Sequence, residues 1–170
     1  MSRTPYFFVE KFDYNTKRYE LQHPIIWNWN HTSQEPADLF PYNGSHDVFS
    51  IVENKHDFPL MNGIHTGLPE NVCEDIKKSF DDSGYKYKDY EGKECVYSPT
   101  PRWFTYADMY IYCLKYPEVP DYDYYDEEKT IMKPTPMKTL KNRVDAFLEV
   151  MNCCGWEDDY SLIRIVYWIE

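Results

Sequence analysis

The sequence predicts a single α+β domain: a mixed or antiparallel sheet, with the C-terminal strand at its centre, packed by about three helices. Two observations indicate the sheet. Residues 6–12 alternate between two faces, and residues 161–169 are almost continuously apolar. Three segments with helical spacing, which begin near residues 67, 105 and 138, indicate the helices. A chain of 170 residues has the length of one domain.

The N-terminal segment predicts a β-hairpin. Turn-forming residues at 13–17 separate the alternating strand from a returning strand at 18–22. On the first strand Phe7 and Val9 share one face, and the other face carries Tyr6, Phe8, Glu10 and Phe12.

Residues 23–46 lack a sustained hydrophobic period. We expect an ordered segment without regular secondary structure, because Trp27 and Trp29 are too apolar to remain in water. The apolar run at 48–52 fits a strand or a short helix equally well. A helix is expected to open at Gly67-Leu68-Pro69-Glu70, bury Val72, Ile76 and Phe80, and end at Gly84.

A second helix is expected after Thr105, which can cap it together with Asp108, and Pro117 should end it. Its predicted buried stripe is Met109, Tyr110, Cys113 and Leu114.

Residues 85–101 carry turn formers and charge. Residues 117–136 combine four prolines with an acidic run and are predicted to form an exposed loop. A third helix is expected at 138–152, with Leu140, Val144, Phe147, Leu148 and Met151 on one face.

The C-terminal strand places Arg164 on the same face as Leu162, Val166 and Trp168. A buried arginine requires a carboxylate or an anionic ligand. The sequence favours the carboxylate and leaves the ligand open.

Composition restricts the function. The formal net charge is −11 and no long Lys/Arg cluster occurs, which disfavours direct binding to nucleic acid. The apolar stretches are too short for a membrane span and the start lacks a signal sequence, so we expect a cytoplasmic protein that does not bind a membrane. Five cysteines without Cys-x-x-Cys spacing are expected to be reduced. Five histidines without metal-site spacing, and the absence of common catalytic motifs, predict no metal, no cofactor and no catalytic residue.

Four blocks, in order along the chain, resemble a family of small uncharacterised proteins of bacteriophages and prophages. Residues 42–52 are similar to a YxGRNYDLFAIL block, residues 67–72 to RGLPDDVS, residues 103–109 to HSHSWFTLAEL and residues 161–169 to DVRIVFWFDN. Phe7-Phe8-Val9-Glu10 also fits. The arginine of the first block and the two histidines of the third are absent here. The resemblance implies an accessory protein of a phage, acting in the cytoplasm of an infected bacterium as a counter-defence factor.

Three hypotheses for function follow. The first is capture of a small anionic host immune signal, such as a nucleotide, in a pocket formed by Arg164, Arg102, Trp103, Tyr42 and His46. The second is inhibition of a host nucleic-acid-targeting enzyme by an acidic, tyrosine-rich segment, because its carboxylates and rings can imitate phosphates and bases. The segment comprises Asp121, Tyr122, Asp123, Tyr124, Tyr125, Asp126, Glu127 and Glu128. The third is an enzyme that degrades a nucleotide. Homo-oligomerisation stays open.

Overall fold

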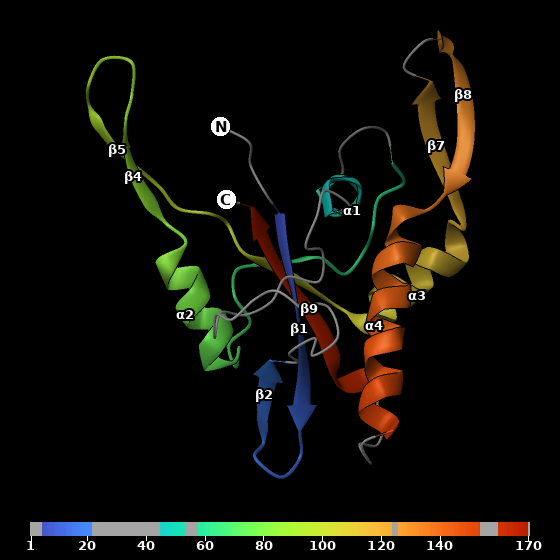
Figure 1. Ribbon diagram of the computed structural model, residues 1–170, viewed down its shortest axis with the longest axis horizontal. Coiled ribbons are helices and arrows are strands. Elements are labelled where there is room, and N and C mark those ends of the chain that lie inside the picture. Colours follow the sequence, from blue (N-terminus) through green and yellow to red (C-terminus); the bar gives the residue numbers. More distant parts are fainter. Residues whose placement is uncertain (1–4, 22–44, 54–57, 124–125, 154–159, 170) are drawn as a thin grey trace.

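The central feature of the fold is a five-stranded antiparallel sheet with the C-terminal strand in the middle (Figure 1). The computed structural model describes residues 5–21, 45–53, 58–123, 126–153 and 160–169. In spatial order the strands are β2 (Arg18–Leu21), β1 (Pro5–Asp13), β9 (Ile163–Ile169), β6 (Arg102–Thr105) and β3 (His65–Thr66). The predicted α+β class, N-terminal hairpin and central C-terminal strand are confirmed.

Helices cover both faces of the sheet. On one side lies α2 (Glu74–Asp82), and on the other lie α1 (Ser45–Val52), α3 (Tyr106–Lys115) and α4 (Pro136–Cys153) (Figure 1). The apolar run at 48–52, which periodicity could not assign, is therefore helical. None of the helices in the described ranges is long and apolar enough to cross a membrane.

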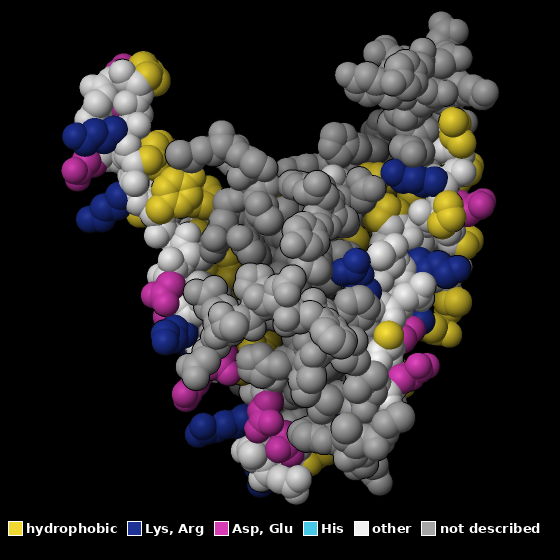
Figure 2. Space-filling view, in the orientation of Figure 1, with side chains coloured by type: hydrophobic (Ala, Val, Ile, Leu, Met, Phe, Trp, Pro, Cys, Tyr) yellow, Lys and Arg dark blue, Asp and Glu magenta, His cyan; other side chains and the backbone are white. Residues whose placement is uncertain are grey.

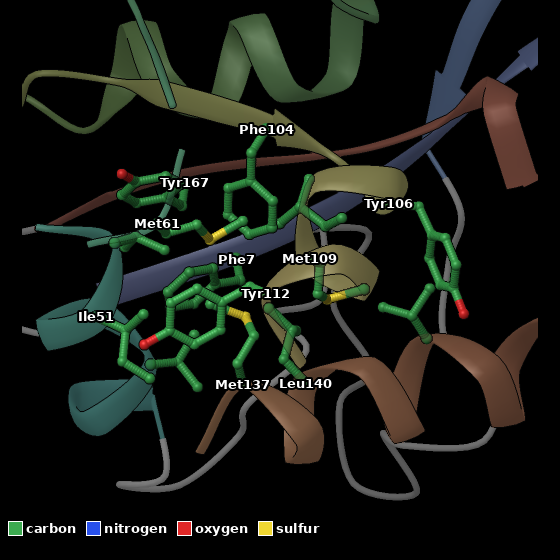
Figure 3. Close-up of a cluster of buried hydrophobic side chains, with 14 of the residues drawn as sticks. Phe7, Ile51, Met61, Phe104, Tyr106, Met109, Tyr112, Met137, Leu140 and Tyr167 are labelled. Atoms are coloured by element: carbon green, nitrogen blue, oxygen red, sulfur yellow. The ribbon is translucent and has the colours of Figure 1, made fainter. Parts of the chain in front are cut away.

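Alternation along β1 and β9 builds two separate apolar layers. Phe7 stacks on Tyr167 with ring centroids 5.3 Å apart, on the side of α1, α3 and α4. Phe8 stacks on Trp168 at 4.7 Å, on the side of α2. Figure 3 shows the larger layer, in which strand residues meet side chains of the three helices, among them Ile51, Met109, Tyr112, Met137 and Leu140. The predicted faces are confirmed for Phe7 and Val9 on one side and for Phe8 and Glu10 on the other, whereas the side chain of residue 6 lies outside the described part.

The first long helix begins later than predicted. Glu74 is its first residue and Cys73 its N-cap, whose sulfur accepts a hydrogen bond from the Ile76 amide. Residues 69–72 form a turn instead, in which the Val72 amide donates to the Pro69 carbonyl. The Cys73 amide donates to buried Glu10 on β1, so a tertiary contact fixes the start of α2. Local proline chemistry alone could not predict this contact.

The second predicted helix is correct in its ends but wrong in part of its buried stripe. Thr105 and Asp108 form the predicted capping box, with the Thr105 amide donating to Asp108 over 2.9 Å. Tyr106, Met109 and Tyr112 are buried, whereas Tyr110 and Leu114 are exposed. These three buried residues belong to the cluster that also contains side chains of α4 and the sheet, so the buried face of α3 includes Tyr112 in place of Tyr110. For the third helix, Leu140 and Val144 are buried as predicted, and the side chains of residues 147, 148 and 151 lie outside the described part.

Two β-hairpins project from this body (Figure 1). One comprises β4 (Tyr85–Lys88) and β5 (Glu94–Tyr97), and the other β7 (Glu118–Asp123) and β8 (Asp126–Pro134). The prediction of an exposed loop at 117–136 is therefore wrong in its secondary structure, because residues 118–123 and 126–134 form paired strands. Pro117 precedes β7, Pro134 ends β8 and Pro136 begins α4, so Pro120 is the one proline of this segment inside a described strand. Val119 is fully buried in the core and anchors the hairpin at its base.

Candidate functional site

Arg164, the first residue of the predicted anion pocket, is held by an ion pair beneath α2. Its Nε donates to Glu10 Oε2 over 2.5 Å, and both side chains are almost completely buried. Its two terminal nitrogens donate to the side-chain and backbone oxygens of Asn71, over 2.8 and 3.0 Å. The carboxylate is the partner that the sequence favoured, and it neutralises the charge that an anionic ligand would use.

Aromatic rings complete the surroundings of this guanidinium. Its central carbon lies 3.4 Å from the Tyr19 ring centroid and 5.7 Å from that of Trp103. Such stacking stabilises a buried guanidinium and fixes its plane. Removal of Arg164 would leave Glu10 buried without its cation, so this arginine contributes to the stability of the fold.

A pocket of about 500 Å³ adjoins this ion pair between β2 and the start of α2. Its lining contains one basic residue, Arg18, against the three acids Glu20, Glu74 and Asp75. Tyr19, Asn71 and Cys73 also contribute to its wall. Burial raises the pKa of the Cys73 thiol to about 12, so the thiol is protonated at neutral pH. The excess of acidic groups makes this a poor site for an anion.

Arg102 lies on the opposite face of the sheet from Arg164. Alternate residues of β6 point to opposite faces, and Arg102 pairs there with Glu53 over 2.9 Å. The Tyr167 hydroxyl donates to the same carboxylate over 3.3 Å, and burial followed by the charge of Glu53 raises the pKa of Tyr167. The second predicted cation is thus also neutralised by a neighbouring carboxylate.

The structure therefore unites Arg164 with Trp103 and separates both from Arg102. Tyr42 and the side chain of His46 lie outside the described residues, so their predicted places in the pocket stay predictions. A neighbour that sequence reasoning missed is His65, whose ring stacks on Trp103 at 4.1 Å. β3 is only two residues long, too short for a periodic signal, and its pairing with β6 creates this contact.

Of the second predicted site, residues 121–123 end β7 and residues 126–128 begin β8, at the outer end of the described part of this hairpin. Asp121 and Tyr122 pair with Ile131 and Thr130, and Asp123 pairs with Asp126 after a register shift. The connecting residues 124 and 125, and the side chains from 121 to 130, lie outside the described part. Residues 118–134 contain six acidic and two basic residues. The fold therefore carries this acidic run away from the body on a paired strand backbone (Figure 1).

The β4–β5 hairpin differs from the β7–β8 hairpin in its balance of charge. Residues 85–97 contain three acidic and three basic residues. Asp89 closes the turn, because its carboxylate accepts from the amides of Glu91 and Lys93, both over 2.9 Å. Tyr90 at the tip is 96% exposed. Figure 2 shows this hairpin as a narrow projection that carries both basic and acidic side chains.

Exposed apolar side chains accompany the acidic hairpin. Ile131 and Met132 on β8 are about half exposed, as are Tyr110, Ile111 and Leu114 on α3. Hydrophobic side chains gather along the edge of the molecule on this side (Figure 2). Apolar groups beside charged ones are typical of protein–protein interfaces.

Comparison with known proteins finds no family model, no curated protein and no solved structure that matches this chain.

Proposed function

We propose that this chain is a protein-binding inhibitor that docks its acidic β7–β8 hairpin into the nucleic-acid-binding groove of another protein. The observation that carries the proposal is the position of the acidic run 121–128 on a hairpin that projects from the body (Figure 1). A groove that binds nucleic acid is lined with Lys and Arg, and a projecting acidic strand pair matches its charge.

Size and anchoring support this role. β7 has six residues and β8 nine, so the hairpin reaches about 20 Å or more from its base. Its base is fixed by buried Val119 and by the Thr135 amide, which donates to the Pro117 carbonyl over 3.1 Å. A pre-ordered hairpin loses less conformational entropy on binding than a disordered acidic loop would lose.

Capture of a small anionic signal, the other main hypothesis, receives less support from the geometry. It depends on cations that are free to bind phosphate. Arg164 is paired with Glu10 and Arg102 with Glu53, and the two arginines face opposite sides of the sheet. Ligand phosphate at either arginine would have to displace a carboxylate that is already in place.

The biological setting of the proposal comes from the resemblance to small bacteriophage proteins. An accessory protein of a phage acts in the cytoplasm of the infected bacterium. Host defence enzymes that recognise nucleic acid present the basic groove that the hairpin requires. We therefore expect the target to be a nucleic-acid-targeting defence enzyme.

The test is capture followed by competition. Immobilised protein is incubated with lysate of a bacterial host, and bound proteins are eluted with excess duplex DNA or RNA. The proposal predicts that the captured protein binds nucleic acid, that nucleic acid releases it, and that its release increases with salt concentration. A captured protein that excess nucleic acid does not displace would contradict groove blocking. Depletion of a nucleotide from the lysate would favour anion capture instead.

A further inference from the structure

A second cavity lies between α3, α4 and the short 3₁₀ helix η1 (Tyr160–Leu162) and belongs to neither site described above. Its volume is about 570 Å³. Its lining combines three tyrosines with three charged residues of α4, namely Tyr106, Tyr110, Tyr160, Lys141, Asp145 and Glu149. In Figure 1 both long helices that form it lie on the same side of the molecule as the β7–β8 hairpin.

The tyrosine rings form a connected aromatic wall. Tyr106 lies 4.7 Å from Tyr160 and 6.4 Å from Tyr110, centroid to centroid, and its ring is nearly parallel to that of Tyr110. Tyr106 is buried, whereas Tyr110 and Tyr160 are about 40% exposed. The outer two rings therefore offer surface to a ligand, while the inner ring supports them.

A fixed polar network forms the floor of the cavity. Asp145 accepts from the Tyr106 hydroxyl over 2.5 Å and pairs with Lys141 over 2.5 Å. Burial, and then the Asp145 carboxylate, raise the pKa of Tyr106, which keeps its hydroxyl protonated and donating. Lys141 also lies 5.5 Å from the Tyr110 centroid and 6.0 Å from that of Tyr106. The ring faces of this cavity thus already accommodate one cation.

The remaining charge of the lining is negative. Lys141, Asp145 and Glu149 follow one another at intervals of four residues, so they share one side of α4. Lys141 neutralises Asp145, and within the described ranges Glu149 forms no ion pair. A ligand that fits must therefore carry positive charge and a flat or apolar body that can stack on tyrosine.

We propose that this tyrosine pocket, defined by Tyr110, Tyr160 and Glu149, binds the guanidinium group of an arginine side chain presented by the target protein. Guanidinium is planar, stacks on tyrosine and pairs with a carboxylate through two parallel hydrogen bonds. The inference rests on the proposed function, because a target with a basic nucleic-acid-binding surface supplies arginines beside the groove that the hairpin enters.

The experiment uses the full chain and small probes, so it does not require the target. N-acetyl-arginine amide is titrated up to about 50 mM while the tyrosine ring signals are followed by NMR, since contacts of this size give millimolar dissociation constants. Saturable shifts of the pocket tyrosines are expected. The citrulline analogue has a planar group of the same shape but no charge, and the lysine analogue has a positive charge but no planar group. Equal binding of either analogue would overturn the assignment to guanidinium, and absence of saturable shifts would overturn the site.

Variants locate the site. Glu149→Gln and Tyr110→Ala should each weaken arginine binding about fivefold, the effect of one charge-assisted hydrogen bond or one stacking contact at a partly exposed position. Glu94→Gln and Tyr85→Ala on the β4–β5 hairpin are the matched controls and should leave binding unchanged. Equal effects of pocket and control variants would contradict the proposal.

Separate measurements test the proposed function and the arginine-binding pocket. Neutralisation of the β7–β8 acids should leave binding of N-acetyl-arginine amide unchanged, because that segment does not line the pocket. Arginine binding without capture of a target would overturn the proposed function alone. Capture of a target that Glu149→Gln and Tyr110→Ala do not weaken would overturn the pocket's role in docking.

Discussion

The charges of the body and those of the β7–β8 hairpin are used in different ways. Beneath α2, Glu10 binds Arg164 and the Cys73 amide, so a single carboxylate joins β1, β9 and the start of α2. On the other face Glu53 binds Arg102 and the Tyr167 hydroxyl. The hairpin, by contrast, has three times as many acidic as basic residues, six against two between 118 and 134.

Buried charges of the body hold strands and helices together, whereas we propose that the acidic excess of the hairpin serves binding to a partner. Buried ion pairs make removal of one member costly, and exposed like charges make removal neutral or slightly stabilising. Stability measurements on single substitutions therefore distinguish the two regions.

The largest effect is expected for Glu10→Ala. Because it leaves Arg164 buried without its counter-ion and removes an acceptor at the α2 N-cap, the free energy of unfolding should fall by about 3–5 kcal/mol. Urea denaturation followed by circular dichroism measures this loss. Glu10→Gln keeps an acceptor and should lose less, which preserves a measurable variant if Glu10→Ala does not fold.

The control for that substitution is an exposed ion pair. Asp81 contacts Lys77 on α2, and both side chains are more than half exposed. Asp81→Ala should lower the free energy of unfolding by at most about 0.5 kcal/mol. Similar losses for Glu10→Ala and Asp81→Ala would contradict the idea that the body depends on its buried pairs.

A backbone test compares a glycine of the body with one of the β4–β5 turn. Gly63 (φ +85°) and Gly92 (φ +80°) both occupy left-handed backbone, where alanine is strained by about 1 kcal/mol. A methyl group on Gly63 would also overlap the Asp108 carboxylate that caps α3, whereas Gly92 faces open space. Gly63→Ala should therefore destabilise by about 1 kcal/mol more than Gly92→Ala, the value of a lost cap. Thermal unfolding of the two variants measures these losses of stability. Equal losses for Gly63→Ala and Gly92→Ala would contradict the predicted overlap with the Asp108 carboxylate.

Alkaline pH provides a second test of the buried layer under α2. The Cys73 thiol pKa rises from an ordinary 9.0 to about 12, first through burial. Between these values the unfolded chain loses the thiol proton and the folded chain keeps it, so stability falls as pH rises. Cys73→Ser keeps an N-cap acceptor without a thiol to ionise, and should lose less stability than wild type above pH 9. Parallel stability curves for the two proteins from about pH 9 to 11 would contradict the assignment.

Most of the sheet was predictable because its signals are local. Alternation in residues 6–12 and the apolar run at 161–169 identified β1 and β9 and their faces, and Thr105 with Asp108 identified the start of α3. The carboxylate partner of Arg164 was also predicted as a residue type. Its identity as Glu10, 154 residues away, depends on strand pairing that no local pattern contains.

The errors have physical causes as well. Residues 117–136 were predicted as a loop because acidic residues and prolines disfavour regular structure, yet pairing between two strands and burial of Val119 outweigh that tendency. The cavity between α3 and α4 could not be predicted, because residues far apart in the chain meet there through helix packing. The start of α2 depends on Glu10 for the same reason.

The most direct test of the account removes charge from the hairpin alone. In one variant Asp121, Asp123, Asp126, Glu127 and Glu128 are replaced by Asn or Gln, and both unfolding and capture of the target are measured on the same preparation. The proposal predicts that the free energy of unfolding changes by no more than about 0.5 kcal/mol for each substitution, the range typical of surface positions. Capture should be lost, whereas amide substitution of Asp89, Glu91 and Glu94 on the β4–β5 hairpin should leave it intact. Full capture by the neutralised variant would contradict the central claim that the acidic hairpin is the docking element.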